Sequence, residues 1–371
     1  MKFTCDKQQL VSAISVASRT VAVKSTIPGL EGLHIHAGAK LTLTGYNLET
    51  GITVSVDADI SEPGVAVFPS RLFFDIVRRL PGDTVSIAMT EDFKVTIVCG
   101  ISRFTITAMS AEDYPELPDV DSRKGIHLPQ QELKTLIAGT LFAVSDSMAR
   151  PVHTGVMFEA ESTLIRAVAV DGYRLALRVY DLPEGENDRE FHFVVPATGL
   201  RELEKILEDS EESCVFYLGP KHILYQVGNA TLVCRTLEGE FLNWRRVLSD
   251  NNPIRLVADV TELAQSIDRV NLVISEKMKS PMRCRFGNGV AYFEAVSTIG
   301  SASDSCTIEG DGGDLEIGFN CKFLLDALHA VPDEKCTLEF INGLSPIMMK
   351  PVDGSKNFSY MVLPVRLKSG E

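Results

Sequence analysis

The sequence predicts an α+β protein of three similar domains, each with two helices packed on antiparallel sheet. Apolar pairs spaced four residues apart recur near the start of each third of the chain: Leu10 and Ile14, Leu133 and Ile137, Leu263 and Ile267. A spacing of four residues places both members of a pair on one face of a helix. A period of about 120 to 130 residues is too long for a solenoid and therefore indicates whole domains.

A second repeated segment doubles the pattern within each third. Its three copies, at 68–72, 195–200 and 319–323, each carry a short apolar stretch into a new helix. Each domain is therefore expected to consist of two similar halves, with one helix in each half.

The expected elements follow from periodicity. Apolar spacing predicts helices at 7–24, 70–80, 129–145, 197–207, 261–279 and 320–331. The first, third and fifth of these are entered from short strands through Asp6, Pro129 and Asp259, and a Pro-Gly pair at 81–82 ends the second. Alternating apolar and polar residues predict strands at 41–44, 52–56, 95–98 and 103–107.

Two polar loops mark the expected domain boundaries. The segment 115–124 is rich in Pro and Asp, and 249–253 reads Ser-Asp-Asn-Asn-Pro. They divide the 371 residues into domains at 1–122, 123–252 and 253–371, each long enough to bury a core of its own.

Composition narrows the class of protein. The eight cysteines are scattered through apolar segments without a C-x-x-C pair, which favours reduced, buried thiols in a cytoplasmic protein. No apolar run approaches the roughly 20 residues that span a bilayer, and the N-terminus lacks the apolar core of a signal peptide. We therefore expect a cytoplasmic chain without a membrane partner.

The charge is unevenly distributed. The formal net charge is −14, which by itself disfavours a nucleic-acid partner. The six predicted helices nevertheless carry more Lys and Arg than Asp and Glu, and the strands and loops carry the excess of acid. If all six helices face one side, that side attracts phosphate; the alternative is a chance fluctuation in small numbers.

Catalytic and metal-binding motifs are missing from the sequence. It contains no Walker loop, G-x-G-x-x-G, G-x-S-x-G or H-E-x-x-H, and paired acids such as Glu211-Glu212 fall in turns. His34 and His36 could share a metal ion on a strand, but no nearby carboxylate or thiol completes such a site. We expect no catalytic residues, no metal and no cofactor, and hence a protein that is not an enzyme.

Four motifs distributed from end to end give the chain a family resemblance. They are the opening Met-Lys-Phe, the Asp-Gly-x-Arg-Leu motif at 171–175, Trp-Arg-Arg-Val at 244–247 and Pro-Val-Arg-Leu at 364–367. With these motifs the chain resembles the bacterial β sliding clamps, the DNA polymerase III beta subunits that make the replicative polymerase processive. The threefold repeat supports the resemblance independently, because it does not depend on these motifs.

The resemblance implies the DNA clamp fold and a dimer that closes head to tail into a ring of six domains. Domains of about 120 residues, treated as spheres, leave a hole of roughly 34 Å when six of them touch in a ring. The implied partners are encircled duplex DNA without sequence preference, a second copy of the chain, and the DNA polymerase III catalytic subunit. The clamp loader, other polymerases and repair proteins are implied to dock through short linear peptides.

A basic channel around the duplex is implied as well. Its candidate residues are Lys24, Arg150, Arg201, Lys205 and Lys279. Sliding requires equal energy at every register, so these cations are expected to attract phosphates loosely rather than to read bases. The alternative for each is a solvated surface cation.

The resemblance further implies a peptide pocket between the second and third domains. The corresponding residues are His153, Val170, Gly172, Tyr173, Arg174, Leu175, Leu242, Arg246, Val247, Met278, Asn320, Phe323, Leu344, Pro346, Met361, Val362, Leu363, Pro364, Val365 and Arg366. His153 stands where the family usually has an apolar residue, and Met278 where an aromatic residue is common. Both departures are expected to widen the groove or to alter peptide preference, whereas Val362 and Val365 have the alternative of being ordinary core residues of a strand.

Two other classes of function stay open on the sequence alone. One is a non-enzymatic three-domain α+β binding protein that does not encircle DNA, for which a monomer is expected. The other is an enzyme whose site the motifs do not reveal, for which a deep pocket with perturbed titratable groups is expected.

Overall fold

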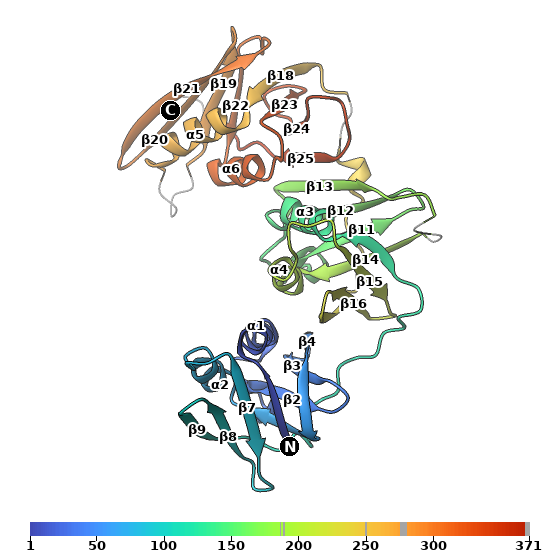
Figure 1. Cartoon of the computed structure of the whole chain (residues 1–371). Coiled ribbons are helices and arrows are strands. Elements are labelled where there is room, and N and C mark those ends of the chain that lie inside the picture. The colour runs from blue at the N-terminus through green and yellow to red at the C-terminus, as the bar shows by residue number, and fades with distance from the viewer. Residues whose placement is uncertain (186, 188–189, 249–250, 275–279, 368–371) are drawn as a thin grey trace. The chain divides into compact units, whose positions relative to one another are not determined.

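The computed structural model describes residues 1–371 except 186, 188–189, 249–250, 275–279 and 368–371 (Figure 1). Within the described residues the chain forms six α-helices, two in each third, as predicted. They are α1 (Lys7–Ala17), α2 (Ser70–Val77), α3 (Gln130–Leu141), α4 (Ala197–Glu204), α5 (Val260–Asn271) and α6 (Cys321–His329). No helix among these residues is long and apolar enough to cross a membrane.

The chain divides into two compact units, Met1–Gln131 with Thr198–Thr236, and Glu132–Ala197 with Leu237–Glu371. The first unit contains two antiparallel sheets. One has the strand order β5 (Ala58–Glu62), β1 (Lys2–Asp6), β7 (Thr84–Met89), β8 (Lys94–Cys99) and β9 (Ser102–Thr107). The other has the order β10 (Ile126–Pro129), β15 (Ser213–Leu218), β16 (His222–Val227), β17 (Ala230–Arg235), β4 (Thr50–Val56), β3 (Leu41–Tyr46), β2 (Leu33–Ala37) and β6 (Gly64–Phe68).

The second unit is built on one twelve-stranded antiparallel sheet. Its first strands are β14 (Phe191–Pro196), β11 (Gly155–Ala160), β12 (Leu164–Val170), β13 (Arg174–Asp181), β25 (Phe358–Val362) and β24 (Ile347–Pro351). The order continues with β23 (Lys335–Phe340), β18 (Ile254–Asp259), β21 (Gly300–Glu309), β20 (Val290–Ser297), β19 (Met282–Gly287) and β22 (Leu315–Phe319). The pairing of β13 with β25 joins residues of the middle third to the C-terminal strand in one continuous sheet.

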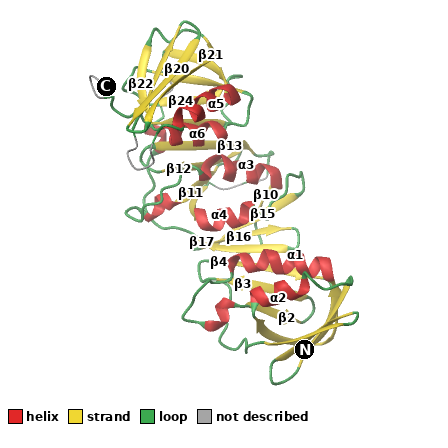
Figure 2. Ribbon diagram, turned by 90° about the vertical axis from the view of Figure 1, so that its left-hand side faces the viewer, coloured by secondary structure: helices red, strands yellow, loops and turns green. Residues whose placement is uncertain are grey.

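The repeated apolar pairs face the core. In α1, Leu10 and Ile14 are fully buried, and the helix packs on β3 and β4 and against α2 (Figure 2). Ile137 in α3 and Ile267 in α5 are equally inaccessible, and α5 packs against α6. Burial of such side chains contributes about 1.5 to 3 kcal/mol each, so the repeat that identifies the domains also stabilises them.

The predicted helix starts are confirmed, and the predicted ends lie too far along the chain. The strands β1, β10 and β18 end at Asp6, Pro129 and Asp259, and both aspartates cap the following helix by accepting a backbone N–H. The first helix ends at Ala17 rather than at residue 24, because the buried Thr20 hydroxyl donates to the Gly45 carbonyl and turns the chain away. The fifth ends at Asn271, and residues 275–279 of its predicted range lie outside the described residues.

Other predictions of local structure can be compared directly. The four strands predicted by alternation correspond to β3, β4, β8 and β9, and all eight cysteines are buried and free, as expected. The domain boundaries at 122–123 and 252–253 stay a prediction.

Candidate functional site

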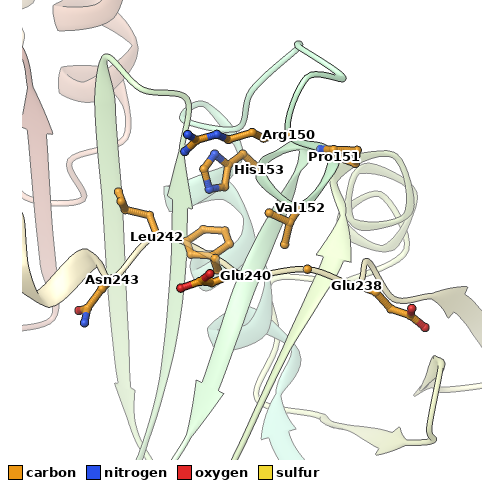
Figure 3. Close-up of a pocket in the computed structure, with 10 residues that line it drawn as sticks. Arg150, Pro151, Val152, His153, Glu238, Glu240, Leu242 and Asn243 are labelled. Carbon is orange, nitrogen blue, oxygen red and sulfur yellow. The ribbon is translucent and has the colours of Figure 1, made fainter.

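A cavity of about 480 Å³ lies in the second unit (Figure 3). One wall is the short 3₁₀ turn Pro151–Thr154 with the preceding Arg150, and the facing wall is the extended segment 238–243. Its lining residues are Arg150, Pro151, Val152, His153, Glu238, Gly239, Glu240, Phe241, Leu242 and Asn243. The cavity therefore brings together His153 and Leu242 of the predicted peptide pocket with Arg150 of the predicted channel.

Beneath the cavity lies an apolar cluster that holds both walls in place. Its buried members are Val152, Met157, Val168, Val170, Leu175, Leu177, Val194, Trp244, Met348 and Met361. Phe241, Leu242 and Val247 pack against this cluster while remaining partly exposed. An apolar floor with partly exposed aromatic and aliphatic side chains above it is typical of a peptide-binding hot spot.

His153 is the buried titratable group of the cavity wall. It is 9% exposed, and its ring meets the Phe241 ring edge to face at 5.2 Å between centroids. Burial, and then the positive charge of Arg150, lower the pKa of His153 below its usual value, so the imidazole is neutral at pH 7. The His153 imidazole adds a hydrogen-bonding group to a pocket whose lining also includes Arg150, Glu238, Glu240 and Asn243.

The turn between β12 and β13 presents Tyr173 to solvent. Gly172 has φ of +92°, a conformation that glycine adopts readily, and the Asp171 carboxylate accepts the backbone N–H groups of Tyr173 and Arg174. Tyr173 is 62% exposed and stacks on Phe323 of α6 with ring centroids 5.7 Å apart. The turn thus places an aromatic pair on the surface where β13 meets α6.

Arg174 links this turn to α6 through ion pairs with Asp171 and Asp326. Its Nε donates to Asp171 at 2.9 Å and its Nη1 to Asp326 at 2.5 Å. The guanidinium group also lies 4.6 Å from the Phe323 ring centroid and 5.6 Å from that of Phe142. Arg174 is 8% exposed, so two carboxylates and two aromatic rings compensate for its burial.

The C-terminal strand runs beside the same turn. The Leu363 N–H donates to the Tyr173 carbonyl at 2.8 Å, and the Val365 N–H donates to the Gly318 carbonyl at 2.8 Å. Val362 is fully buried, which fits the alternative of an ordinary core residue, whereas Val365 is 38% exposed. Only the second valine presents an apolar side chain to a ligand.

The remaining predicted pocket residues divide by exposure. Val170, Leu175 and Met361 are buried in the floor, and Asn320 caps α6 by accepting the Lys322 N–H. The partly or fully exposed members are Arg246, Val247, Leu344, Pro346, Leu363, Pro364 and Arg366. Met278 lies outside the described residues.

The predicted channel residues lie on separate elements of the two units. Lys24 is exposed in the loop after α1, Arg201 is exposed on α4, and Lys205 follows α4 in an ion pair with Glu202 at 2.7 Å. Arg150 lines the cavity beside His153, and Lys279 lies outside the described residues.

Sequence reasoning missed several residues of the site. Phe241 precedes the Leu242 and Trp244 segment, and its apolar neighbours were the available signal. Phe142 and Asp326 were not detectable, because their contacts with Arg174 join positions far apart in the chain. In the part of the chain that the structure describes, no group of three or more His, Cys, Asp or Glu could hold a metal ion.

Comparisons with known proteins agree along the whole chain. Family models of the DNA polymerase III beta subunit match in order: the N-terminal domain at residues 1–118, the central domain at 127–243 and the C-terminal domain at 245–366. The beta sliding clamp of Staphylococcus aureus is 31% identical over 379 residues, with 99% of each chain covered.

Solved structures give the same result. A DNA polymerase III beta subunit from Eubacterium rectale superposes with a TM-score of 0.93 at 32% identity, over 98% of this chain and 99% of that one. The DNA polymerase sliding clamp from Bacillus subtilis has a TM-score of 0.93 at 29% identity, over 99% and 100% of the two chains. The resemblance and the three-domain α+β fold predicted from sequence are thereby confirmed, and the chain belongs to the DNA polymerase III beta subunit family.

Proposed function

We propose that this chain is a DNA sliding clamp, which closes as a head-to-tail homodimer around duplex DNA and docks the replicative polymerase through short peptides. The observation that carries the proposal is the ordered match of three beta-subunit domain models from residue 1 to residue 366. The chain acts as a scaffold in this function and performs no catalytic step.

Two strand edges support closure by a second copy. β9 is the last strand of its sheet and pairs with β8 alone among the described residues. β21 is paired along its length with β20, but β18 covers only Ile308 and Glu309 on its other side, so residues 301–305 have no described strand there. Unpaired edges are templates for pairing with another chain, and an edge from each of two copies would complete such a pair.

Exposed apolar side chains near these edges support the same interface. Phe104 on β9 is 42% exposed, and Leu272, at the end of α5, is 77% exposed. Val273 follows Leu272, and its carbonyl accepts the hydroxyl of Ser297 at the end of β20, so this apolar position lies close to the hairpin that β21 continues. Burial of such side chains between two copies would stabilise a dimer.

The dimer is tested by light scattering on the purified chain. We expect twice the chain mass of 40.6 kDa for the wild type and a shift toward the monomer for Leu272→Glu, which adds a charge at an exposed position. Leu344→Glu is the matched control, because Leu344 is 83% exposed and belongs to neither edge strand. A wild-type monomer at micromolar concentration would favour the binding protein that does not encircle DNA.

Retention on DNA is then topological, and the channel cations only hold the duplex loosely. We propose Lys24, Arg150, Arg201, Lys205 and Lys279 for this role. Arg201 and Lys24 are exposed and have no ion-pair partner among the described residues, so their charges are available to phosphate. Each phosphate neutralised contributes to a steep loss of affinity with salt.

Charge reversal tests the channel. Lys24→Glu with Arg201→Glu is expected to shorten retention on circular DNA and to reduce its salt dependence, while the dimer stays intact. The control is Lys40→Glu with Lys356→Glu, which makes the same charge change at two exposed surface turns. Equal retention by both double variants would contradict the channel assignment.

For partner docking we propose the cavity beside His153 together with the surface formed by Tyr173, Phe323, Leu344, Pro346 and Val365. The two areas share the apolar floor that Met361 and Leu175 provide. An apolar groove rimmed by a few polar groups binds an extended peptide through side-chain anchors. Loss of peptide binding in Tyr173→Glu, without loss of the dimer, is the expected outcome.

A further inference from the structure

His153 is a polar side chain that the protein buries without giving it a hydrogen-bond partner. It lines the cavity at 9% exposure, and among the described residues neither ring nitrogen donates to or accepts from any group. Its backbone is satisfied separately, since its N–H donates to the Arg150 carbonyl and its carbonyl accepts from the Ser145 N–H. The side-chain atoms that are buried without any partner do not include the His153 nitrogens, so the imidazole is reached through the cavity and is available to a ligand.

The positive and negative charges near the His153 imidazole lie on opposite walls of the cavity. Arg150 lies on the same wall, and Figure 3 shows its guanidinium group next to the His153 ring. The facing wall carries Glu238 and Glu240, of which Glu238 points away from both groups in Figure 3. Arg150 has no ion-pair partner among the described residues, so this end of the cavity holds an unpaired cation and an unpaired imidazole.

We propose that Arg150 and His153 read a carboxylate, so that a partner peptide places an Asp or Glu side chain at this end, next to an apolar side chain on Phe241 and Leu242. This inference rests on the proposed function, because it names the chemistry of the peptide that the clamp docks. An arginine and a histidine that share one carboxylate supply two charge-assisted donors. The apolar neighbour fills the remaining cavity, where Val152 and Phe241 offer only hydrocarbon.

Selectivity for a carboxylate follows from its charge. A carboxylate accepts charge-assisted hydrogen bonds from the Arg150 guanidinium group and the His153 imidazolium, whereas the neutral amide of glutamine accepts weaker ones. A carboxylate beside His153 also favours the imidazolium form, which Arg150 and burial disfavour in the empty cavity. Binding of an acidic peptide is therefore coupled to proton uptake, and binding of its amide counterpart is not.

The experiment uses the full-length dimer and matched fluorescein-labelled decapeptides, followed by anisotropy. Each carries two adjacent leucines in a Gly-Ser background, preceded or followed by Glu in one peptide and by Gln in the other. For the better of the two Glu positions we expect about tenfold tighter binding than for Gln, equivalent to about 1.4 kcal/mol. The preference should grow from about pH 8 to about pH 5.5, a window in which glutamate stays ionised.

Two variants separate the roles of the residues. His153→Leu restores an apolar wall and should remove the pH dependence and most of the Glu preference while keeping affinity for the Gln peptides. Arg150→Gln should reduce the Glu preference and leave a pH-dependent remainder. His329→Gln is the matched control, because His329 is an exposed histidine at the end of α6, and it should behave as the wild type.

Different outcomes would contradict the carboxylate assignment and the docking of peptides at this cavity. Gln and Glu peptides that bind the wild type equally, at every pH, would overturn the carboxylate assignment while leaving the docking pocket standing. Binding of none of these peptides, together with an intact dimer, would overturn the assignment of docking to this cavity as well. A preference only for peptides that end in a free carboxylate directly after the leucines would overturn the side-chain form of the proposal.

Discussion

Arg174 and His153 are two polar side chains buried in the same compact unit, and they differ in what surrounds them. Arg174 contacts the carboxylates of Asp171 and Asp326 and lies over two aromatic rings. The His153 ring contacts the Phe241 ring, and its pKa is lowered by burial and by the charge of Arg150. Its nitrogens have no acceptor or donor among the described residues. The difference separates a group that holds the frame of the site from one that remains available to a ligand.

The largest loss of stability is expected from removing the charge of Arg174, whose guanidinium group is paired with two carboxylates. Arg174→Met removes the guanidinium group and leaves Asp171 and Asp326 facing a hydrocarbon chain. Loss of one member of a buried ion pair costs on the order of 3 kcal/mol of unfolding free energy. Because the Asp326 side chain is 30% exposed, solvent screens part of this cost. Urea denaturation measures it, and an unchanged midpoint would contradict the role of Arg174 as a clamp on α6.

A second arginine on β13, Arg178, is expected to show the opposite effect on stability when its charge is removed. Arg178 is 6% exposed, its Nε and Nη1 have no partner among the described residues, and the Phe358 ring lies 5.8 Å away. Arg178 interacts with the Tyr360 hydroxyl but contacts no carboxylate among the described residues, so its buried charge is only partly compensated. Replacing such a cation with a chain of similar shape is neutral or stabilising, so Arg178→Met is expected to raise the unfolding free energy by about 1 kcal/mol. A loss as large as that of Arg174→Met in the same denaturation series would refute this interpretation of Arg178.

Substitution of Gly172, in the turn that carries Tyr173, is expected to lower stability by a similar amount through backbone strain. Gly172 has φ of +92° and open space around its Cα, so Gly172→Ala meets backbone strain of about 1 kcal/mol and no clash. Gly354→Ala is the matched control, since Gly354 has φ of +77° and equally open surroundings in a turn outside the site. Both variants should lose similar stability in thermal denaturation, and only Gly172→Ala should weaken peptide binding.

The smallest expected effect is the change in stability with pH that His153 causes. The pKa of His153 is lowered in the folded chain, so the unfolded chain takes up the proton first as the pH falls. This group's contribution to stability is therefore present above its usual pKa of about 6.5 and is lost as the pH falls through the lower folded value. The urea midpoint of the wild type should drop more than that of His153→Leu between pH 7.5 and pH 5.5. Parallel curves would show that His153 does not titrate differently in the two states.

The repeat predicted the architecture because core burial dictates it. Leu10, Ile137 and Ile267 are inaccessible in the fold, so the spacing that buries them was visible in the sequence as helical periodicity. The helix ends were less predictable, because Thr20 ends the first helix through a bond to Gly45, a contact that local sequence does not encode.

The candidate site was predicted only in part. The resemblance located His153, Leu242 and Tyr173, but no local pattern indicates that Arg150, predicted as a channel cation, also lines the cavity. Pro151 begins a 3₁₀ turn directly after Arg150, and this turn brings the arginine and His153 to the same wall. Such a placement depends on the facing segment 238–243, which is distant in sequence and becomes a neighbour only in the folded unit.

Retention of the protein on DNA by encirclement is tested most directly by comparing circular with linear DNA. The clamp is loaded onto a nicked circular plasmid by a clamp loader, separated from free protein at raised salt, and followed over time with and without cutting of the plasmid. We expect long retention on the circle and rapid loss through the ends after cutting, with the circle-bound fraction less sensitive to salt than the fraction left on cut DNA. Equal loss from both forms would show ordinary electrostatic binding and would contradict the clamp.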